Sequence, residues 1–570
     1  MKMIYPDIET FRRDSESFDS IPEFRQSQLE KNCNQLFVKG PALTKDFLEK
    51  MNTDIVPKKT YLFGYELNTK KILFLCGLFL LFFISLFGAI TIWFTDYFDN
   101  TVLSTMVISN SSNNIKMWTN PSPKSLVKVH IFNYTNLKEY DNKWDKKLKV
   151  QEVGPYVYEE SLERVNVQFD DDGNFVSFQE KRSYNFRPDL SKGKQSDQVH
   201  VPNIPLMAGT AMSKYHNYFV RLAFSSFLTG LDEKPFVTLP ADKFIIGYRN
   251  KLLDLSQSWT RLNGLESLSS ETVGILASKN GVQPNVITMN TGKADINKLG
   301  LIEKLNGKDH FEYWSTEECD RVTAADGMVY PPKLVQRKQP LHFLIPQMCR
   351  TLPLVFENEA TILNGKIPAY RYKSPEYIFD TAEERPGNQC YCSLTSGDCP
   401  LKGVYNVTPC NFGVPSFISN PHFLGADESL LTAIDGLKTL DKKDIETYIN
   451  LHPSMGFSMS GRATFQLNVQ VQKAFGVYQL DRYDDGLLLP IAWLEIELNE
   501  KNLPQDFLNI IYEATYTLKG VKMAFEYGFL LTTLITLICI ILVLRNTWER
   551  PNRLAVNMRD LQRQAEDNQI

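Results

Sequence analysis

The sequence predicts a membrane protein of mixed α and β structure (α+β), with one large domain between two membrane-spanning helices. This fold class follows from two long apolar runs near the ends of the chain, the first without charge and the second with only Glu526 near its start, and from strand-like alternation between them. The chain has 570 residues, 43% of them hydrophobic, which is enough to build a large core. Its formal net charge is -4 with both signs mixed, so the composition argues against a nucleic-acid-binding protein.

The first apolar run covers residues 72–95 and directly follows Lys70 and Lys71. Roughly 20 apolar residues, each rising about 1.5 Å, cross a hydrocarbon core of about 30 Å. Trp93 and Phe94 stand at the far end of the run, where aromatic rings favour the membrane interface. The run is too long, and too far along the chain, for a cleaved signal peptide. We therefore expect a retained signal anchor.

The second apolar run covers residues 524–544 and is followed by Arg545, Arg550 and Arg553. Basic residues thus precede the first run and follow the second, so the positive-inside rule puts both ends of the chain in the cytoplasm. Residues 96–523 then form an extracytoplasmic domain (the ectodomain). Residues 1–71 and 545–570 are predicted cytoplasmic tails, the first of them mostly disordered.

Two features of the cytoplasmic side suggest sorting or lipidation. Tyr5 and Ile8 fit a tyrosine-based endocytic signal, in which a bulky apolar residue stands three positions after the tyrosine. Cys76 lies about one turn inside the first run, where a cysteine either carries a palmitoyl chain or simply fills a small apolar position.

Six of the nine cysteines fall in the predicted ectodomain and crowd into one part of it: Cys319, Cys349, Cys390, Cys392, Cys399 and Cys410. An even number in an oxidising compartment predicts three disulfides, and six cysteines allow fifteen pairings, among which the spacing does not choose. A zinc site is the alternative, but the spacing is not that of paired CxxC motifs and no nearby histidine completes a ligand set.

Glycosylation sequons agree with this topology. Asn-x-Ser/Thr triplets occur between the two apolar runs at Asn110, Asn133 and Asn406. We expect glycans at these three asparagines.

Strand patterns dominate the ectodomain. Residues 127–131 alternate apolar and polar side chains, and two further alternating segments, 165–169 and 175–178, flank an Asp172-Gly173 pair typical of a hairpin. The clearest strand covers residues 464–472, with Phe465, Leu467, Val469 and Val471 on one face and polar side chains on the other. We expect the apolar face to be buried and the polar face to be wet or to line a polar surface.

Residues 206–228 lack this alternation and predict a helix. Tyr215, Phe219, Leu222 and Phe227 follow helical spacing, and Phe224 makes the opposite side apolar as well. A helix that is apolar nearly all round is either buried or presents an apolar surface to a ligand or partner.

Catalytic motifs fail on inspection, so we expect no enzyme, no cofactor and no metal. The segment 456–460 lacks the final glycine of a nucleophile elbow, and the seven histidines form no HExxH pair. A two-span ligand-gated channel is a further alternative. The polar positions of the two spans, such as Ser85 and Thr533, suit helix packing better than an ion path.

Ordered motifs between the two runs resemble the class B scavenger receptor family. In family order they are Trp118, the segments 129–136 and 152–159, Trp314 with Cys319, Asp326-Gly327, Cys349-Arg350, Cys390-Tyr-Cys392, 419–423 and 435–437. The resemblance covers almost the whole ectodomain. One such motif would be weak, whereas the ordered set is specific.

The resemblance implies an antiparallel β-barrel core, a helical bundle at the membrane-distal apex, and a hydrophobic tunnel leading toward the bilayer. It also implies the disulfide pairing Cys319 with Cys390, Cys349 with Cys410, and Cys392 with Cys399. The helix at 206–228 would belong to the apex, where Lys234 lies a turn beyond the place at which related proteins carry a lysine, here Gly230. Tyr215, Phe219, Leu222, Phe224, Phe227 and Lys234 are then the expected ligand or partner site.

The implied function is a plasma-membrane receptor that binds fatty acids, sterols or lipoproteins and takes them up through the tunnel. The alternative is a trafficking receptor for a protein partner in the endosomal or lysosomal pathway. The C-terminal tail lacks the acidic dileucine signal of the lysosomal branch, which favours the cell surface.

Overall fold

The two apolar runs form long helices. The computed structural model describes residues 60–62, 65–67, 69–111, 115–254, 272–393, 397–411 and 413–567. Within these residues two helices are long and apolar enough to cross a membrane, Thr69–Phe94 and Gln505–Asn546. Residues 1–59 of the predicted cytoplasmic tail lie outside the described residues. The last part of this tail, residues 60–71, contains two short paired strands, β1 (Thr60–Leu62) and β2 (Tyr65–Leu67).

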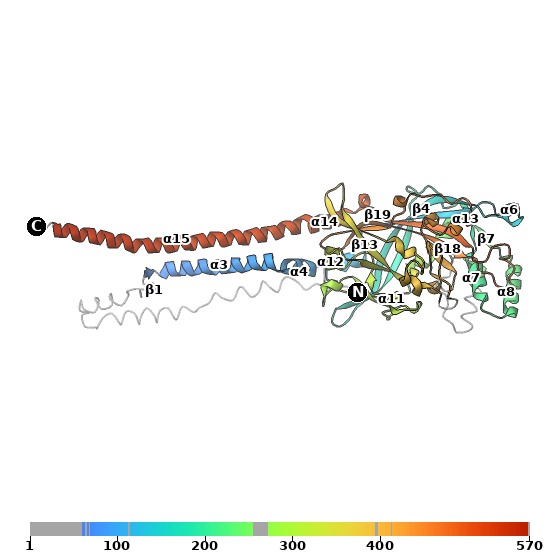
Figure 1. The fold of residues 1–570 in the computed structure, drawn as a ribbon, viewed down its shortest axis with the longest axis horizontal. Helices are drawn as coiled ribbons and strands as arrows, with labels where there is room; N and C mark the ends of the chain where they lie inside the picture. The colour runs from blue at the N-terminus through green and yellow to red at the C-terminus, as the bar shows by residue number, and fades with distance from the viewer. Residues whose placement is uncertain are drawn as a thin grey trace, which may run out of the picture. The chain divides into compact units, whose positions relative to one another are not determined.

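Helix α3 (Thr69–Phe94) matches the first predicted span closely, whereas α15 (Leu518–Asp567) continues well beyond the second, predicted to end at residue 544. The extension is rich in straight-chain helix formers such as Arg, Leu, Gln and Glu. The two helices run side by side (Figure 1), with Thr533 Oγ1 2.9 Å from Ser85 Oγ and the Trp93 ring against Tyr527. Small and polar positions therefore pack the helices together, as expected.

Two units can be told apart, residues 1–87 with 529–570, and residues 88–528. The second unit is built on a closed ring of twelve strands, in which β19 pairs with both β3 and β18. In ring order the strands are β3 (Ser125–Tyr134), β4 (Val150–Phe169), β5 (Phe175–Phe186), β9 (Ile287–Asn290), β10 (Leu301–Leu305), β11 (Ala324–Ala325), β12 (Leu341–Ile345), β13 (Arg350–Ile362), β14 (Ile367–Lys373), β17 (Tyr448–Leu451), β18 (Ser458–Gln470) and β19 (Leu488–Leu498). All neighbours are antiparallel except β11 and β12, which pair in parallel.

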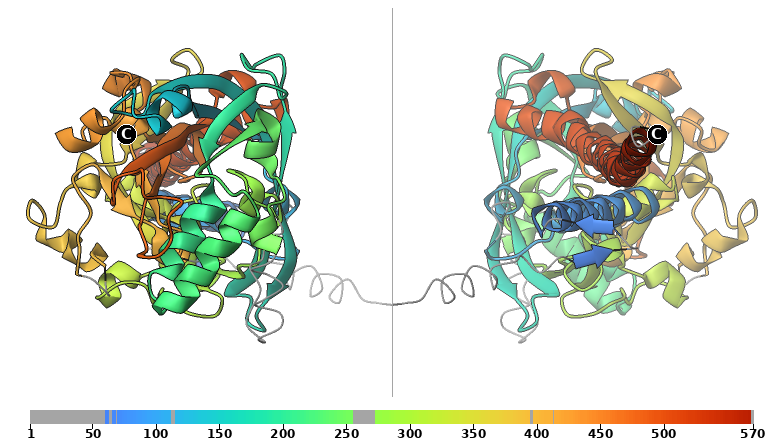
Figure 2. Two further views of the ribbon diagram at one scale, coloured as in Figure 1. Left: turned by 90° about the vertical axis from the view of Figure 1, so that its right-hand side faces the viewer. Right: turned by 90° about the vertical axis from the view of Figure 1, so that its left-hand side faces the viewer.

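Smaller elements surround the ring. β16 (Ser416–Ser419) and β15 (Val404–Asn406) extend the sheet from β18, β8 (Gly281–Val282) adds to β5, and β6 (Gln198–Pro202) pairs with β7 (Phe236–Pro240). The helices of this unit include α4 (Tyr97–Ser104), α5 (Ile115–Thr119), α6 (Leu137–Asp141), α7 (Ile204–Ser213), α8 (Tyr218–Gly230), α9 (Ala241–Ile246), α11 (Glu317–Asp320), α12 (Pro332–Gln336), α13 (Glu428–Ala433) and α14 (Gln505–Tyr512). Helices α7 and α8 lie together at the end of the unit opposite to α14 (Figures 1 and 2).

The short helical turns are mostly 3₁₀ helices. They are η2 (Ala277–Lys279), η3 (Ile296–Lys298), η4 (Pro346–Met348), η5 (Glu376–Phe379), η6 (Pro386–Tyr391), η7 (Thr408–Cys410), η8 (Pro421–Phe423), η9 (Lys442–Asp444) and η10 (Glu500–Asn502). The exception is η11 (Glu513–Thr517), a π-helical turn that joins α14 to α15.

The predicted hairpin is confirmed as β4 and β5. The Asp170 carboxylate accepts a hydrogen bond from the Phe175 amide at 2.8 Å, and Gly173 takes a left-handed conformation with φ of 68°. Only glycine adopts that conformation at little cost, which explains why the Asp-Gly pair ends one strand and starts the next.

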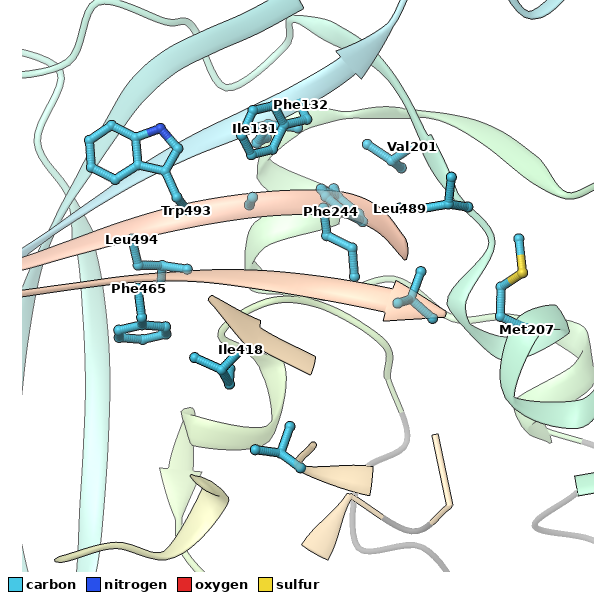
Figure 3. Packing of buried hydrophobic residues seen from close by; sticks show 14 of the residues in the cluster. Ile131, Phe132, Val201, Met207, Phe244, Ile418, Phe465, Leu489, Trp493 and Leu494 are labelled. Atoms are coloured by element: carbon cyan, nitrogen blue, oxygen red, sulfur yellow. The ribbon is translucent and has the colours of Figure 1, made fainter. Parts of the chain in front are cut away.

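The largest core cluster lies where β3, β18 and β19 meet α7 and α9 (Figure 3). Ile131, Phe132, Met207, Phe244 and Leu489 are all fully buried in it. Burying one such side chain contributes roughly 1.5–3 kcal/mol, so this cluster is a main source of the stability of the unit.

The polar face of β18 is not wet. Thr464, Gln466 and Asn468 are buried like the apolar residues between them. Gln466 accepts a hydrogen bond from the backbone amide of His422 at 2.6 Å, and Asn468 donates one to Ser419 Oγ at 3.0 Å. Gln466 and Asn468 find these partners on η8 and β16, and Thr464 donates to the carbonyl oxygen of Ile445, so each buried polar side chain is satisfied.

The predicted helix at 206–228 is two helices, α7 and α8. The Asn217 side chain accepts a hydrogen bond from the Val220 amide at 3.1 Å and so caps the start of α8. An asparagine at this position satisfies an otherwise unpaired amide of the first turn, so the chain restarts its helix there. Phe219, Leu222 and Phe227 keep the predicted helical spacing on α8, whereas Tyr215 lies in the turn before Asn217 and is not helical.

Candidate functional site

A cavity of about 730 Å³ lies inside the barrel. Side chains alternate across a strand, and on β4, β5 and β9 every second residue lines it over part of the strand, for example Leu162 and Arg164 of β4. Most of the lining is apolar and comes from several strands, for example Leu162, Ile287, Met289, Ile302, Phe343 and Ile496. A closed sheet of this size therefore encloses a hydrophobic compartment.

The wall formed by β4 and β5 carries charged side chains into this compartment. Glu160 and Arg164 of β4 line the cavity together with Glu180 and Arg182 of β5. In the pairing of β4 with β5, Arg164 lies opposite Glu180. Two residues earlier on β4, Leu162 lies opposite Arg182. Alternation therefore puts all four charges on the inner face of the barrel.

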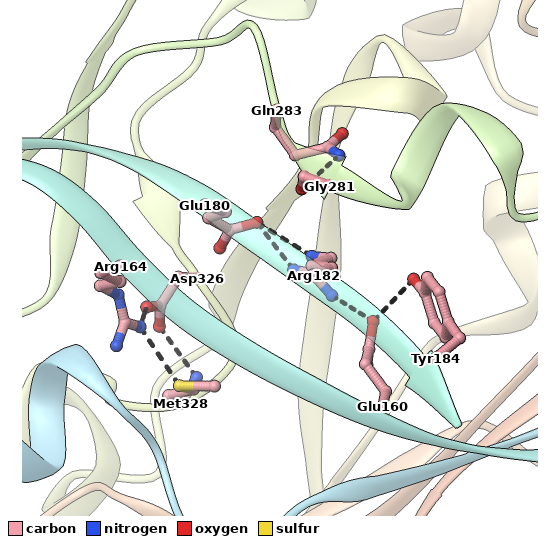
Figure 4. A network of polar contacts seen from close by, with 9 residues as sticks. All are labelled: Glu160, Arg164, Glu180, Arg182, Tyr184, Gly281, Gln283, Asp326 and Met328. Atoms are coloured by element: carbon pink, nitrogen blue, oxygen red, sulfur yellow. Dashed lines mark hydrogen bonds and ion pairs between the residues drawn. The ribbon is translucent and has the colours of Figure 1, made fainter. Parts of the chain in front are cut away.

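Three of these charges, Glu160, Glu180 and Arg182, form a connected network (Figure 4). Arg182 donates to Glu160 Oε1 at 2.7 Å and to Glu180 Oε2 at 2.8 Å, and Tyr184 donates to the same Glu160 oxygen at 2.9 Å. Burial alone would raise the pKa of Glu160, but Arg182 and Tyr184 lower it below its ordinary value. Burial, and then the charge of Glu160, raise the pKa of Tyr184. Arg182 is thus shared by two carboxylates, and its charge favours the ionised form of Glu160.

Arg164 forms a second buried ion pair. Its Nη2 lies 2.6 Å from Asp326 Oδ2, and the two side chains are 1% and 8% exposed. The guanidinium also lies over the Trp118 ring, 4.8 Å from its centroid, and Asp326 accepts a hydrogen bond from the Met328 amide at 2.9 Å. This pair ties β4 to the loop after β11.

The cavity continues toward the membrane-spanning helix α15. Phe507 and Ile510 of α14, Glu513 and Ala514 of η11, and Leu518 at the start of α15 all line it. A π-helical turn widens the helix locally and is often found at functional positions. This end of the compartment is thus built from the segment that leads into the second span.

The predicted apical residues form a surface patch. Tyr215 and Phe219 are 77% and 80% exposed, Phe227 is also exposed, and Leu222 and Phe224 are half-buried. Lys234 is exposed, and its Nζ lies 3.5 Å from Asp232 Oδ2. None of these six residues, all of which the structure describes, lines the cavity. The patch and the cavity are therefore separate features.

Three further aromatic residues of this patch were not predicted from the sequence: Tyr218 on α8 and two residues from a distant segment. Phe475 is 77% and Tyr478 61% exposed, and the Phe475 ring lies 5.7 Å from that of Tyr218 on α8. They follow β18 and lie far from α8 in the sequence. No local pattern signals the association, which arises only from the packing of the loop against the helix. We call Tyr215, Tyr218, Phe219, Phe475 and Tyr478 the apical patch.

Three disulfides form within the described residues: Cys319–Cys390, Cys349–Cys410 and Cys392–Cys399. This is the pairing implied by the resemblance. The cysteines that a zinc site would use, Cys390, Cys392 and Cys399, are all in disulfides, and no group of three His, Cys, Asp or Glu side chains in the described chain is arranged to hold a metal ion.

The other predicted sites stay predictions. Asn133 lies in β3 and accepts a hydrogen bond from the His200 amide at 2.7 Å, and Asn406 lies in β15, where it accepts one from the Thr408 amide at 2.9 Å. Asn110 is described, but its sequon ends at Ser112, which is not. Cys76 is an exposed free cysteine of α3. Tyr5 and Ile8 lie outside the described residues.

Comparison with known proteins places this geometry among membrane receptors. A family model described as the CD36 family matches residues 75–544. Scavenger receptor class B member 1 of Rattus norvegicus is 30% identical over 395 residues, covering 69% of this chain and 74% of that protein. Lysosome membrane protein 2 of Homo sapiens is 28% identical over 376 residues, covering 66% of this chain and 75% of that protein.

Proposed function

The chain belongs to the CD36 family, and from this premise we propose that it is a plasma-membrane receptor that binds hydrophobic ligands and transfers them through its ectodomain. The relatives named as scavenger receptor and lysosome membrane protein support a receptor in a membrane. The chain crosses the membrane twice, and the proposed ligands are fatty acids, sterols or the lipids of lipoproteins.

The internal cavity carries this proposal. Ligand sites in proteins typically occupy about 300–1,000 Å³, and the cavity volume of about 730 Å³ lies within that range. Each methylene group that moves from water into such an apolar space gains about 0.8 kcal/mol. A lipid in the compartment keeps its chain out of water. At one end of the compartment it reaches α14 and the start of α15. Transfer down a gradient needs no nucleotide or cofactor.

Lipid retention tests this proposal. The full-length protein is purified beside two variants of β4, Leu162→Trp, which fills the cavity, and Glu163→Trp, which changes the opposite face of the strand, where Glu163 pairs with Lys181. Mass spectrometry of extracted lipids should find one lipid class enriched near stoichiometry in the wild type and in Glu163→Trp, but depleted in Leu162→Trp. Equal lipid content in all three proteins, or no enrichment in the wild type, would contradict the proposal.

The apical patch favours a second candidate function, a trafficking receptor for a protein partner in the endosomal or lysosomal pathway. Monomeric proteins rarely expose several large aromatic side chains side by side, and such patches typically mark protein interfaces. Phe219→Asp should then abolish partner capture while leaving the bound lipid unchanged. Loss of lipid in that variant would indicate that the patch serves ligand entry instead.

A further inference from the structure

Lys279 brings a positive charge to the inner wall of the barrel. It is the last residue of η2, and β8, which starts two residues later, pairs with β5 so that Gly281 stands opposite Arg182. Lys279 therefore lines the cavity next to the network of Glu160, Glu180 and Arg182.

The ammonium group of Lys279 has no ion pair and no hydrogen bond to any of the described residues. Its closest aromatic neighbour is Phe465, whose ring centroid lies 5.8 Å from Nζ. The two carboxylates near it already bind Arg182, and Glu160 also accepts a hydrogen bond from Tyr184. Burial, and then the charge of Arg182, lower the pKa of Lys279 below its ordinary value. Its three N–H donors thus face the compartment without an acceptor.

The charges around the Lys279 ammonium indicate which ligand group would stabilise it. Glu160, Glu180, Arg182 and Lys279 together carry no net charge, so the cluster is neutral as a whole. Yet both carboxylates bind Arg182, and the half-buried ammonium of Lys279 loses part of its solvation at the cavity wall without gaining a direct partner. An oxygen anion that contacts Nζ removes that cost, whereas an apolar ligand leaves it in place.

The rest of the compartment is suited to an apolar chain. Apart from the β4 and β5 wall, the lining is dominated by aliphatic and aromatic side chains such as Met289, Ile302 and Phe343. A complementary ligand therefore has one acidic oxygen group and one long hydrocarbon tail. A sterol or a fully esterified lipid has the tail but lacks the charge.

We propose that Lys279 is a headgroup subsite that binds the carboxylate of a long-chain fatty acid whose hydrocarbon tail lies in the barrel cavity. This inference rests on the proposed function, because it assigns a ligand class to the same compartment. It makes Lys279 a specificity-determining residue, which selects acidic lipids over neutral lipids with the same chain.

Competition between oleate and methyl oleate tests the subsite, because the two share the chain and the carbonyl but differ in charge. The full-length protein is equilibrated with equimolar amounts of both, and native mass spectrometry measures the ratio of bound oleate to bound methyl oleate. The variants are Lys279→Met, which keeps the length of the side chain without its charge, and Lys279→Arg, which keeps the charge. The matched control is Lys298→Met, at an exposed lysine of η3.

We expect the wild type, Lys298→Met and Lys279→Arg to prefer oleate. A hydrogen bond to a charged group contributes enough for Lys279→Met to lower the bound ratio roughly 10- to 100-fold. Methyl oleate binding should stay unchanged, which also shows that Lys279→Met is folded.

Four outcomes would overturn the subsite. An unchanged ratio in Lys279→Met, or no preference for oleate in the wild type, refutes the role of Lys279 while leaving lipid binding intact. Equal loss of both lipids in Lys279→Met would mean that the shared carbonyl, not the charge, is recognised. Binding of neither lipid by the wild type would refute the proposed function itself, and the subsite with it.

Discussion

His452 should make the ectodomain sensitive to acid. It follows β17, and its Nδ1 accepts hydrogen bonds from the backbone amides of Ser454 and Met455 at 3.3 Å and 3.2 Å. Its Nε2 therefore carries the proton and donates it to Thr515 Oγ1, 3.2 Å away in η11. The ring also stacks on Phe457, with the centroids 5.0 Å apart. A second proton on Nδ1 would break both amide contacts.

The size of the effect follows from the pKa of this histidine. Burial lowers it from 6.5 to about 4. Between the pKa of about 4 in the folded state and 6.5 in the unfolded state, the folded protein binds fewer protons than the unfolded chain. The contribution of His452 to the free energy of unfolding is therefore fully present above pH 6.5 and is lost as the pH falls toward 4. From pH 7.5 to pH 5 the loss amounts to about 2 kcal/mol. For a unit of more than four hundred residues this is about 2 °C in melting temperature.

Thermal unfolding of the full-length protein at pH 7.5 and pH 5 measures this effect. The melting temperature of the wild type should fall between the two pH values by about 2 °C more than that of His452→Gln, which has no titrating group at this position. The matched control is His216→Gln, at an exposed histidine between α7 and α8, and it should fall as much as the wild type. An equal fall in the wild type and in His452→Gln would refute the reasoning.

Three further predictions concern stability and topology. Joint replacement of Cys349 and Cys410 by alanine opens a disulfide that spans 61 residues and should cost about 4 kcal/mol, seen as failed export to the cell surface; normal surface levels would contradict this. Arg164→Met leaves Asp326 buried without its partner and should cost roughly 3–5 kcal/mol in thermal unfolding, and addition of Asp326→Asn should recover part of the loss. If the single and double variants unfold alike, the ion pair is not the cause. Glutamine at the asparagine of all three sequons should abolish the gel shift on deglycosylation, and a shift that persists would point to other sites or to a different topology.

Much of the architecture was predictable because it depends on neighbours in the sequence. The first span follows from an uninterrupted apolar run, and the β4–β5 hairpin follows from alternation on both sides of Asp172-Gly173. The apolar face of β18 was predicted in the same way; Phe465 and Val469 are buried there and Leu467 is half-buried. In each case the signal lies within one element, where geometry repeats every two residues in a strand or 3.6 in a helix.

The functional features were harder to predict because they join distant segments. The apical patch combines Phe219 with Phe475, and only the packing of two separate segments brings them to one surface. No sequence pattern marks Lys279. Its proposed role depends on its place in the cavity wall and on Arg182, which binds the two nearby carboxylates of Glu160 and Glu180.

The sequence by itself determined the two spans, the strand-rich ectodomain and, through its ordered motifs, the family. The tertiary structure alone decided that the polar face of β18 is buried, that the 206–228 segment divides at Asn217, and that charges line the inside of an apolar cavity. The physical reason is the same in all three. Whether a side chain is buried, and with which partners, depends on what the rest of the chain places over it, and local periodicity carries no record of that.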